Sequence, residues 1–344
     1  MIKKFIYFIA VCLLFLLCFM VWNMMNFTSK QIDVTPVRKV SINNQQAVIN
    51  LSESIRYKTI SNNSESVDAM SFLSFHKFLR RTYPQVFRVF TERVFSGYSL
   101  LLKWESVIEN PSSPILLMAH MDVVPAENID EWIYDPFSGA VKDEAVWGRG
   151  TIDDKSSLIS ILESFEYLIS SGFQPNKDIY ISIGHDEENG GKSGNGAISK
   201  ALNDEGIYFE MVLDEGQIIS DGIIEVVDKP IAVIGIAEKG SLMMELTSNY
   251  DPGHSSIPGE STTIGKLAKA ISNLETFQMK PRLSKPVKYF LDYLGPELPY
   301  KDKFILSNSN LLSASILNEM IKEPVTASMV RSTVAPTMIN AGVK

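Results

Sequence analysis

Three groups of acidic and histidine side chains follow directly on short apolar runs: His120-Met121-Asp122 after 115–119, His185-Asp186-Glu187-Glu188 after 178–184, and Asp214-Glu215 after 211–213. Apolar runs of this length are typical of buried strands. In α/β sheets, sites form where strands end. Each group alone has a simpler explanation, either a surface histidine beside an acid or a solvated acidic turn. Together they predict one site at the ends of several strands.

His120 and Asp122 stand two residues apart, so in an extended chain they point to the same face. Asp122 can then accept the spare imidazole N–H and fix the ring for metal binding. A further pair, Asp153 and Asp154, follows a glycine-rich turn at the start of a predicted helix, 155–171. Carboxylates also cap helix N-termini well, so capping is the simpler interpretation of that pair alone.

The composition limits which side chains could hold a metal. Both cysteines, Cys12 and Cys18, lie in the first apolar segment, so thiolate ligands are excluded from the rest of the chain. Three consecutive acids at a strand end repel one another, and a bound cation would relieve that repulsion. Carboxylates with imidazole and no sulfur suit a hydrolytic two-metal centre with a bridging carboxylate.

Apolar periodicity predicts the elements that must position these side chains. Strands alternate with helices in the first half, which favours an α/β sandwich around a mixed, mostly parallel sheet. Near residue 231 the pattern changes to antiparallel strands and then a helix, and we place domains at 45–236 and 237–344. We expect helices at 48–58, 71–83, 155–171 and 263–274, and strands at 86–94, 98–104, 115–119, 178–184, 211–213, 231–237 and 242–247.

The N-terminus carries an uncharged apolar run of 18 residues, Phe5 to Trp22, preceded by Lys3 and Lys4. This length nearly spans a hydrocarbon core, and the lysines predict a cytoplasmic N-terminus. We expect residues 1–27 to be an uncleaved signal-anchor, with a cleaved signal peptide as the alternative, and 28–44 to be a linker. The body would then be extracytoplasmic, in a periplasm or lumen. A net charge of −8 argues against a nucleic-acid partner.

The order and spacing of five motifs resemble the M20 family of two-zinc metallopeptidases, nearest its carboxypeptidase S and N-fatty-acyl-amino-acid hydrolase branch. The motifs are His120-Met121-Asp122, Gly148 to Lys155, His185 to Gly191, Leu213 to Gly216, and Gly253 to Pro258. The resemblance implies a three-layer zinc-peptidase-like domain with an inserted ferredoxin-like α+β lid. It also implies zinc-dependent hydrolysis of an amide bond beside a free carboxylate, in a peptide or an N-acyl amino acid.

Position by position, the resemblance implies the roles of single residues. His120 and Asp214 would bind one zinc, Glu188 the second, and Asp153 would bridge both, with a cis peptide bond between Asp153 and Asp154. Glu187 would be the general base and Asp122 would orient His120. His254 would lie in the lid, which forms a homodimer in relatives, and would stabilise the oxyanion of the partner's site. We expect His185 to be a packing residue or to support a metal ligand from behind, and His76 to lie on a helix surface.

Members of the family supply a second histidine ligand far downstream, and no histidine follows His254. We therefore expect a C-terminally truncated chain with an incomplete lid, exposed sheet edges and a second zinc site that lacks a ligand. Two classes of function remain from the sequence. The chain is either an active hydrolase or a catalytically inactive, membrane-bound binding module.

Overall fold

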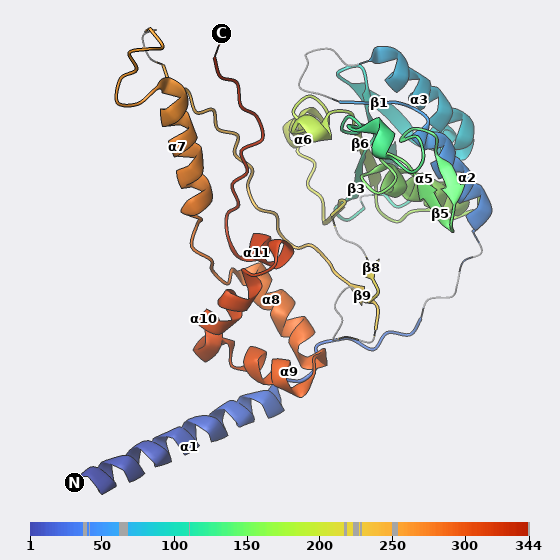
Figure 1. The fold of residues 1–344 in the computed structure, drawn as a ribbon. Coiled ribbons are helices and arrows are strands. Elements are labelled where there is room, and N and C mark those ends of the chain that lie inside the picture. Colours follow the sequence, from blue (N-terminus) through green and yellow to red (C-terminus); the bar gives the residue numbers. More distant parts are fainter. Residues whose placement is uncertain are drawn as a thin grey trace. The chain divides into compact units, whose positions relative to one another are not determined.

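The computed structural model describes residues 1–36, 40, 42–61, 68–109, 111–216, 219–222, 227, 229–249 and 254–342. The chain divides into two compact units, 37–216 and 1–36 with 217–344 (Figure 1). The first unit thus ends at residue 216, earlier than the boundary at 236 expected from sequence patterns. The predicted acidic site, apart from His254, belongs to this first unit.

The first unit is built on a five-stranded sheet of order β1-β2-β6-β3-β7. Strand β3 pairs in parallel with β6 and β7, whereas β2 pairs antiparallel with β1 and β6. The sheet is therefore mixed, as expected, with as many antiparallel as parallel pairings. The strands are β1 (Thr91–Phe95), β2 (Ser99–Trp104), β3 (Ile115–His120), β6 (Ile179–Gly184) and β7 (Met211–Leu213).

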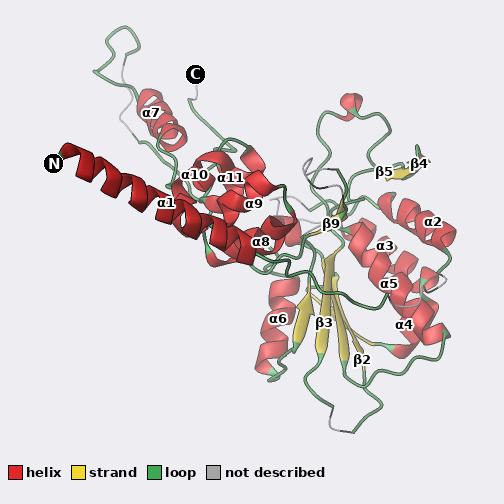
Figure 2. Ribbon diagram, turned by 90° about the horizontal axis from the view of Figure 1, so that it is seen from below, coloured by secondary structure: helices red, strands yellow, loops and turns green. Residues whose placement is uncertain are grey.

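Helices cover both faces of this sheet, which gives three layers (Figure 2). Phe75 and Leu162 pack with Ile181 on one face, and Ile198 packs with Tyr180 on the other. Residues of β6 are buried throughout, which explains why its sequence is almost uniformly apolar. The helices are α2 (Asn44–Ile55), α3 (Ala69–Thr82), α4 (Pro84–Val89) and α5 (Lys155–Ser170) on the first face and α6 (Asn195–Asp204) on the second; β4 (Ala140–Lys142) and β5 (Ala145–Trp147) form a separate hairpin.

The expected strand at 86–94 is wrong in its first half, where the chain forms α4. Pro84 occupies the first helical turn, where a missing N–H costs nothing. The Glu166 carboxylate accepts the N–H groups of Gln85 and Val86, which lie in the first turn of α4, at 3.0 to 3.1 Å. A long-range contact from α5 thus stabilises a helix that local alternation of apolar residues does not predict.

The second unit contains mainly helices. Helix α7 confirms the helix expected at 263–274, but of the strands expected at 231–237 and 242–247 only Ile231–Ala232 is a strand among the described residues. The sequence analysis did not predict the four helices after α7. The elements are α1 (Ile2–Asn26), β8 (Ile219–Ser220), β9 (Ile231–Ala232), α7 (Thr263–Thr276), α8 (Lys285–Leu294), α9 (Tyr300–Ser307), α10 (Ser309–Met320) and α11 (Pro324–Val330).

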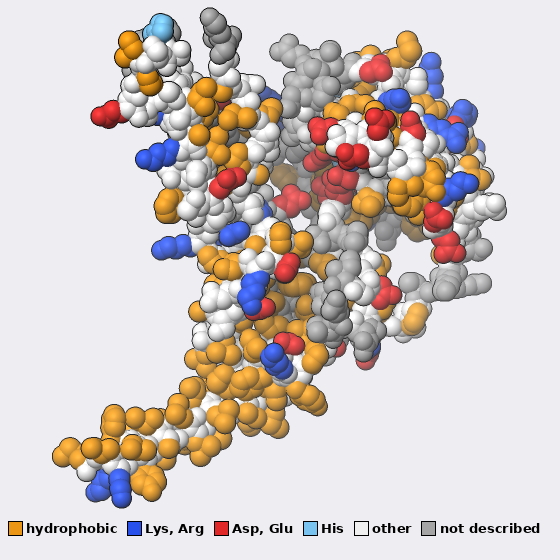
Figure 3. Space-filling model, in the orientation of Figure 1, with side chains coloured by type: hydrophobic (Ala, Val, Ile, Leu, Met, Phe, Trp, Pro, Cys, Tyr) orange, Lys and Arg blue, Asp and Glu red, His pale blue; other side chains and the backbone are white. Residues whose placement is uncertain are grey.

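Helix α1 is a single helix of 25 residues whose most apolar 18-residue window has a mean hydropathy of 2.8, so it is long and apolar enough to cross a membrane or to serve as a signal sequence. Its surface is hydrophobic along its length (Figure 3). Its uniformly apolar sequence predicts a helix that packs on nothing in the body, and this prediction is wrong at the C-terminal end of the helix. There the Asn308 side chain donates to the Met20 carbonyl at 3.1 Å and accepts from Asn23 at 2.9 Å.

Candidate metal centre

The carboxyl ends of three parallel strands meet at one edge of the sheet and bring the acidic residues together. His120 is the last residue of β3, Glu187 begins the short 3-10 turn after β6, and Glu215 lies two residues beyond the end of β7. Asp153 comes from the turn that leads into α5. This edge is where α/β folds place their sites.

His120, Asp153, Glu187 and Glu215 form what we call the carboxylate cluster. The His120 Nε2 atom lies 2.8 Å from Asp153 Oδ1, 3.4 Å from Glu215 Oε1 and 3.9 Å from Glu187 Oε2. One ligand atom from each of His120, Asp153 and Glu215 lies within 4.8 Å of the others. Within the described part of the chain, no lysine or arginine forms an ion pair with the three carboxylates. The cluster therefore has an excess of negative charge suited to a cation.

The His120 ring is buried, with 1% of its surface exposed, and held in one orientation. Its Nδ1 atom lies 3.0 Å from the Asp122 backbone oxygen and 3.4 Å from Asp122 Oδ1, so Nδ1 is the donor and Nε2 faces the cluster. Burial alone lowers the pKa of His120, but hydrogen bonds to Asp122 and Glu215 and their negative charges raise it to about 12. A divalent cation at Nε2 would supply the positive charge that this proton supplies.

Asp122 is fully buried and joins two strand ends. Its Oδ1 atom accepts the Glu187 N–H and its Oδ2 atom accepts the Glu188 N–H, both at 3.1 Å. Besides lying against His120, Asp122 thus fixes the turn that carries the predicted general base.

Glu187 and Glu188 stand in surroundings that disfavour their charged forms. Burial raises the pKa of Glu187; the His120 charge opposes this increase, and the Glu215 charge adds to it. Burial, and next the negative charge of Asp153, raise the pKa of Glu188. The Glu188 Oε1 atom accepts the Val124 N–H at 3.3 Å. A raised carboxyl pKa is what a general base working near neutral pH requires.

Glu215, and not the predicted Asp214, contributes to the cluster. The Asp214 side chain is exposed, and its Oδ1 atom accepts the Glu215 N–H at 3.0 Å. Successive residues of an extended chain point to opposite sides, so only one of an adjacent pair can face the cluster. The backbone after Leu213 decides which one it is, and the sequence holds no signal for that choice.

In the segment between the glycine-rich turn and α5, one expectation from the sequence is confirmed and another is wrong. The peptide bond between Asp153 and Asp154 is cis, as the resemblance implied. Asp154 makes no side-chain cap to α5; instead its buried Oδ2 atom accepts the His120 N–H at 3.2 Å. Burial raises the pKa of Asp154 to about 6. Capping is therefore not its function.

Lys155, the first residue of α5, is fully buried. Its Nζ atom donates to the Ser54 carbonyl at 3.0 Å and to the Tyr57 carbonyl at 2.7 Å. Ser54 belongs to the last turn of α2, and Tyr57 follows the end of that helix by two residues. The contacts fasten the start of α5, and with it Asp153, to α2.

The remaining histidines lie outside the cluster. His76 is buried with 3% exposure, and its Nε2 lies 2.8 Å from the Tyr98 carbonyl, so the expected surface position is wrong. Its spacing of four residues from Phe72 on a helix was the signal we missed. His185 is buried against Ser99 Oγ at 2.6 Å, as expected of a packing residue. His254 is exposed and belongs to the other unit, so its role in the site stays a prediction.

Asp186 is a structural residue of the site that the sequence analysis left unassigned. Its Oδ2 atom accepts the Ser193 N–H at 2.7 Å and its Oδ1 atom accepts the Gly194 N–H at 2.8 Å. The loop that carries Glu187 is thereby closed on itself. At Gly194 a Cβ atom would lie 2.4 Å from Asp186 Oδ1, so the closure requires glycine. In the sequence the three consecutive acids are indistinguishable.

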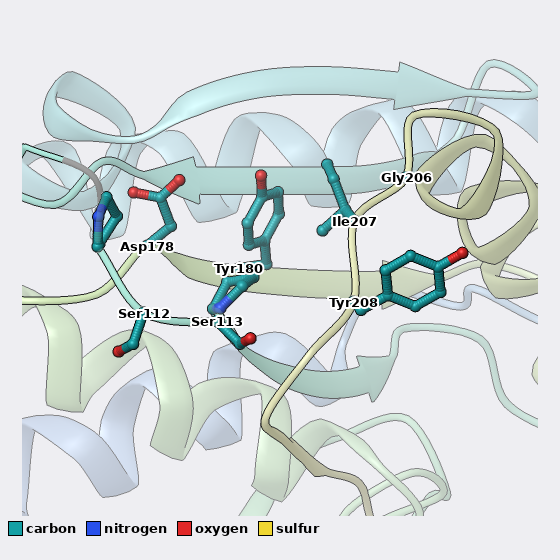
Figure 4. Close-up of a pocket in the computed structure, with 9 residues that line it drawn as sticks. Ser112, Ser113, Asp178, Tyr180, Gly206, Ile207 and Tyr208 are labelled. Carbon is teal, nitrogen blue, oxygen red and sulfur yellow. The ribbon is translucent and has the colours of Figure 1, made fainter.

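A pocket lined by Asp178, Tyr180 and Tyr208 lies elsewhere on this unit (Figure 4). Its lining includes Pro114 and Asp178, the residues immediately before β3 and β6. The pocket therefore opens where these strands begin, at the edge opposite the carboxylate cluster.

Comparison with known proteins decides the family. The model of peptidase family M20/M25/M40 matches residues 116–338, which is more than half of the chain and includes the whole cluster. The chain belongs to this peptidase family. This match confirms the family that the sequence motifs indicated. The M20 relatives are enzymes, namely metallopeptidases and related hydrolases.

Two curated relatives are similar over most of the chain. A probable carboxypeptidase S-like 2 of Dictyostelium discoideum is 37% identical over 340 residues, covering 96% of this chain and 65% of the relative. The N-fatty-acyl-amino acid synthase/hydrolase PM20D1 of Xenopus tropicalis is 37% identical over 304 residues, covering 87% and 59%. The chain thus spans less than two thirds of the length of either relative.

Among solved structures, an M20 family metallo-carboxypeptidase from Sulfolobus solfataricus is 20% identical, with a TM-score of 0.41 over 50% of this chain and 37% of that one.

Proposed function

We propose that this chain carries the metal centre of a hydrolase that cleaves an amide bond beside a free carboxylate, in a peptide or an N-acyl amino acid. The observation that carries the proposal is the arrangement of Asp153, Glu187 and Glu215 around the imidazole of His120. The relatives named for carboxypeptidase S and for N-fatty-acyl-amino acids support the substrate class.

We propose zinc as the metal. His120, Asp153 and Glu215 would hold one ion, and Asp153 with Glu188 would hold a second. The donor set fits, because imidazole and carboxylates in tetrahedral or slightly larger coordination are usual for catalytic zinc, and no thiolate is required. When bound, zinc lowers the pKa of a coordinated water towards neutrality and polarises the scissile carbonyl.

Side chains of the protein then transfer the proton and hold the catalytic groups in place. Glu187, whose carboxylate is about half exposed and whose pKa burial raises, takes the proton of the attacking water and passes it to the leaving amine. Asp122 holds Glu187 through its backbone N–H and lies against the far side of the His120 ring. The exposed Asp153 carboxylate leaves the cluster open to substrate.

We further propose that α1 anchors the chain in a membrane with its N-terminus in the cytoplasm, as Lys3 and Lys4 predict. Protease added outside spheroplasts should then remove the body and leave a small anchored fragment. A body that stays protected would contradict this orientation. A homodimer through residues 237–344, with His254 reaching the partner's site, stays a prediction.

The catalytic proposal is tested by measuring zinc per chain and hydrolysis of an N-acyl amino acid and a dipeptide. Substituting Glu187→Gln should leave bound zinc unchanged and lower the turnover about 100- to 10,000-fold, the usual contribution of a general base. Lys77→Gln, on the outer surface of α3, serves as the control. A chain that binds no zinc, or a Glu187→Gln variant with full activity, would refute the assignment.

A further inference from the structure

The chain directly after α1 is fastened along helices α8 to α10. Asn308, at the junction of α9 and α10, is 2% exposed and bonds both Met20 and Asn23 of α1. Farther on, Lys30 pairs with Asp292 at 3.1 Å, and the Gln31 side chain donates to the Tyr293 carbonyl at 3.1 Å. These contacts fix the depth of α8 to α10 relative to the end of α1.

A further contact closes this junction. The Phe27 ring lies so near Gly295 that a Cβ atom there would come within 2.6 Å of it. Gly295 follows α8 directly, and Phe27 follows α1 directly. The apolar end of α1 is therefore packed against the helices as well as hydrogen-bonded to them.

The position of Met20 along α1 sets the depth of the junction in a bilayer. Lys4 is the last charged residue of the helix, and Met20 lies 16 residues beyond it. At about 1.5 Å per residue this is about 24 Å. A hydrocarbon core is about 30 Å thick, so with Lys4 at the inner boundary the Met20 carbonyl lies about 6 Å inside the outer one. The Asn308 side chain, which bonds this carbonyl at 3.1 Å, would lie just inside the boundary between acyl chains and headgroups.

Helices α8 to α10 present side chains suited to that boundary. Tyr300 is 82% exposed, and Tyr293 and Leu311 are each 52% exposed. Hydrophobic side chains continue from α1 onto the adjoining helices (Figure 3). Tyrosine prefers the membrane interface because its ring is apolar and its hydroxyl stays hydrated.

Charge contributes little to this surface. From residue 285 to 303 the lysines Lys285, Lys288, Lys301 and Lys303 face nearly as many acids, Asp292, Glu297 and Asp302. Attraction to anionic lipid grows with each unpaired basic residue near the surface, and because Asp292 already pairs with Lys30, only two lysines are in excess here. Contact between these helices and the bilayer should therefore depend on burial of aromatic and aliphatic side chains, and should also occur with zwitterionic lipid.

We propose that α8, α9 and the start of α10 form a lipid-contacting surface that lies in the outer headgroup layer around the end of α1. This inference rests on the proposed insertion of α1, and not on the hydrolase activity. The second unit would then be held against the bilayer by a broad surface, in contrast to a domain lifted off by a free linker.

The test uses the full chain in vesicles of dioleoylphosphatidylcholine, with a single fluorescent label on cysteine. One label is placed on native Cys12 in a Cys18→Ser variant, and the others on Tyr300→Cys, Leu311→Cys or Lys269→Cys in a chain in which both native cysteines are serine. Lys269 is exposed on α7, which Figure 1 draws well apart from α1. We expect nitroxide-labelled phosphatidylcholine to quench the labels at 300 and 311 at least twofold more than the label at 269.

The Cys12 label separates failure of the surface from failure of the anchor. Strong quenching at Cys12, with quenching at 300 and 311 no greater than at 269, would overturn the surface and leave the anchor intact. Absence of quenching at Cys12 would overturn the anchor and this inference with it. If the labels at 300 and 311 were quenched only after anionic lipid is added, the inference that aromatic and aliphatic side chains hold this surface at the bilayer would be wrong.

A second comparison tests the contact that sets the depth. Asn308→Ala removes both bonds to α1, whereas Asn310→Ala changes an exposed residue in the first turn of α10. We expect the first substitution to reduce quenching at Leu311→Cys at least twofold and the second to leave it unchanged. Equal quenching in both variants would show that Asn308 does not hold the surface at the bilayer.

Discussion

Asp122→Asn tests how far the cluster depends on a single buried carboxylate. Both oxygens of Asp122 accept backbone N–H groups, from Glu187 and Glu188 at 3.1 Å. Asparagine keeps one acceptor oxygen and presents an NH2 group in place of the other, so one of the two backbone donors loses its partner. The His120 ring keeps its contact with the Asp122 backbone oxygen at 3.0 Å, because the substitution leaves the main chain unchanged.

The magnitude follows from the bond that is lost. A hydrogen bond to a charged group contributes about 1.5–3 kcal/mol, more than a neutral one. If the displaced turn weakens the site by that amount, metal affinity falls about 10- to 100-fold, since each factor of ten corresponds to about 1.4 kcal/mol. This agrees with the usual loss of about 10- to 100-fold when a partner of a metal ligand is removed.

The measurement is a zinc titration in competition with a chromophoric chelator, on the wild-type chain and on two variants. Asp68→Asn is the matched control, because Asp68 also accepts two backbone N–H groups, from Met70 and Ser71, but lies at the start of α3. We expect Asp122→Asn to bind zinc about 10- to 100-fold more weakly and Asp68→Asn to bind it like the wild type. Equal affinity in all three chains would refute the argument that Asp122 positions the site.

Three further outcomes follow from the structure. Glu215→Gln should lower zinc affinity by more than about 100-fold, while Asp214→Asn leaves it unchanged; the reverse order in the same titration would restore the assignment made from sequence. Burial lowers the pKa of His76 from 6.5, so the stability that neutral His76 contributes is present above that pH and is lost as the pH falls below it. The His76→Gln variant should therefore show a smaller fall in melting temperature in acid than the wild type. An unchanged dependence of melting temperature on pH would contradict this. Gly194→Ala should destabilise by about 1–3 kcal/mol in denaturant unfolding, whereas Gly240→Ala, whose Cβ meets nothing within 4 Å, should be neutral; equal midpoints would show that the loop relaxes.

Elements with a strong apolar period were predictable from the sequence. Helix α5 and strands β3 and β6 appear within a residue or two of their expected bounds, because buried strands and amphipathic helices leave local patterns. Helix α8 also carried such a pattern, with Val287, Phe290, Leu291 and Leu294 at helical spacing, and the sequence analysis overlooked it. Helix α4 differs, since the partner that stabilises it comes from α5.

The candidate site was predictable in its residue types and in its place in the fold. The sequence could not distinguish Asp214 from Glu215, nor the structural Asp186 from its neighbour Glu187. Adjacent acids differ only in the direction in which the backbone points their side chains. That direction is set by the conformation of the loops after the strand ends. The position of His76 could have been inferred, because it shares a helix face with Phe72.

The buried ammonium group of Lys155 has a consequence for the design of soluble forms of this protein. Its two carbonyl partners come from the first helix of the compact unit, at Ser54, and from the residues just after that helix, at Tyr57, far from Lys155 in the chain. A shortened protein that begins after residue 57 would leave the buried Lys155 amine without these acceptors, and an unpaired buried polar group costs a large fraction of the stability of an ordinary domain. Removal of α1 is compatible with folding of this unit only if the new N-terminus precedes Asn44.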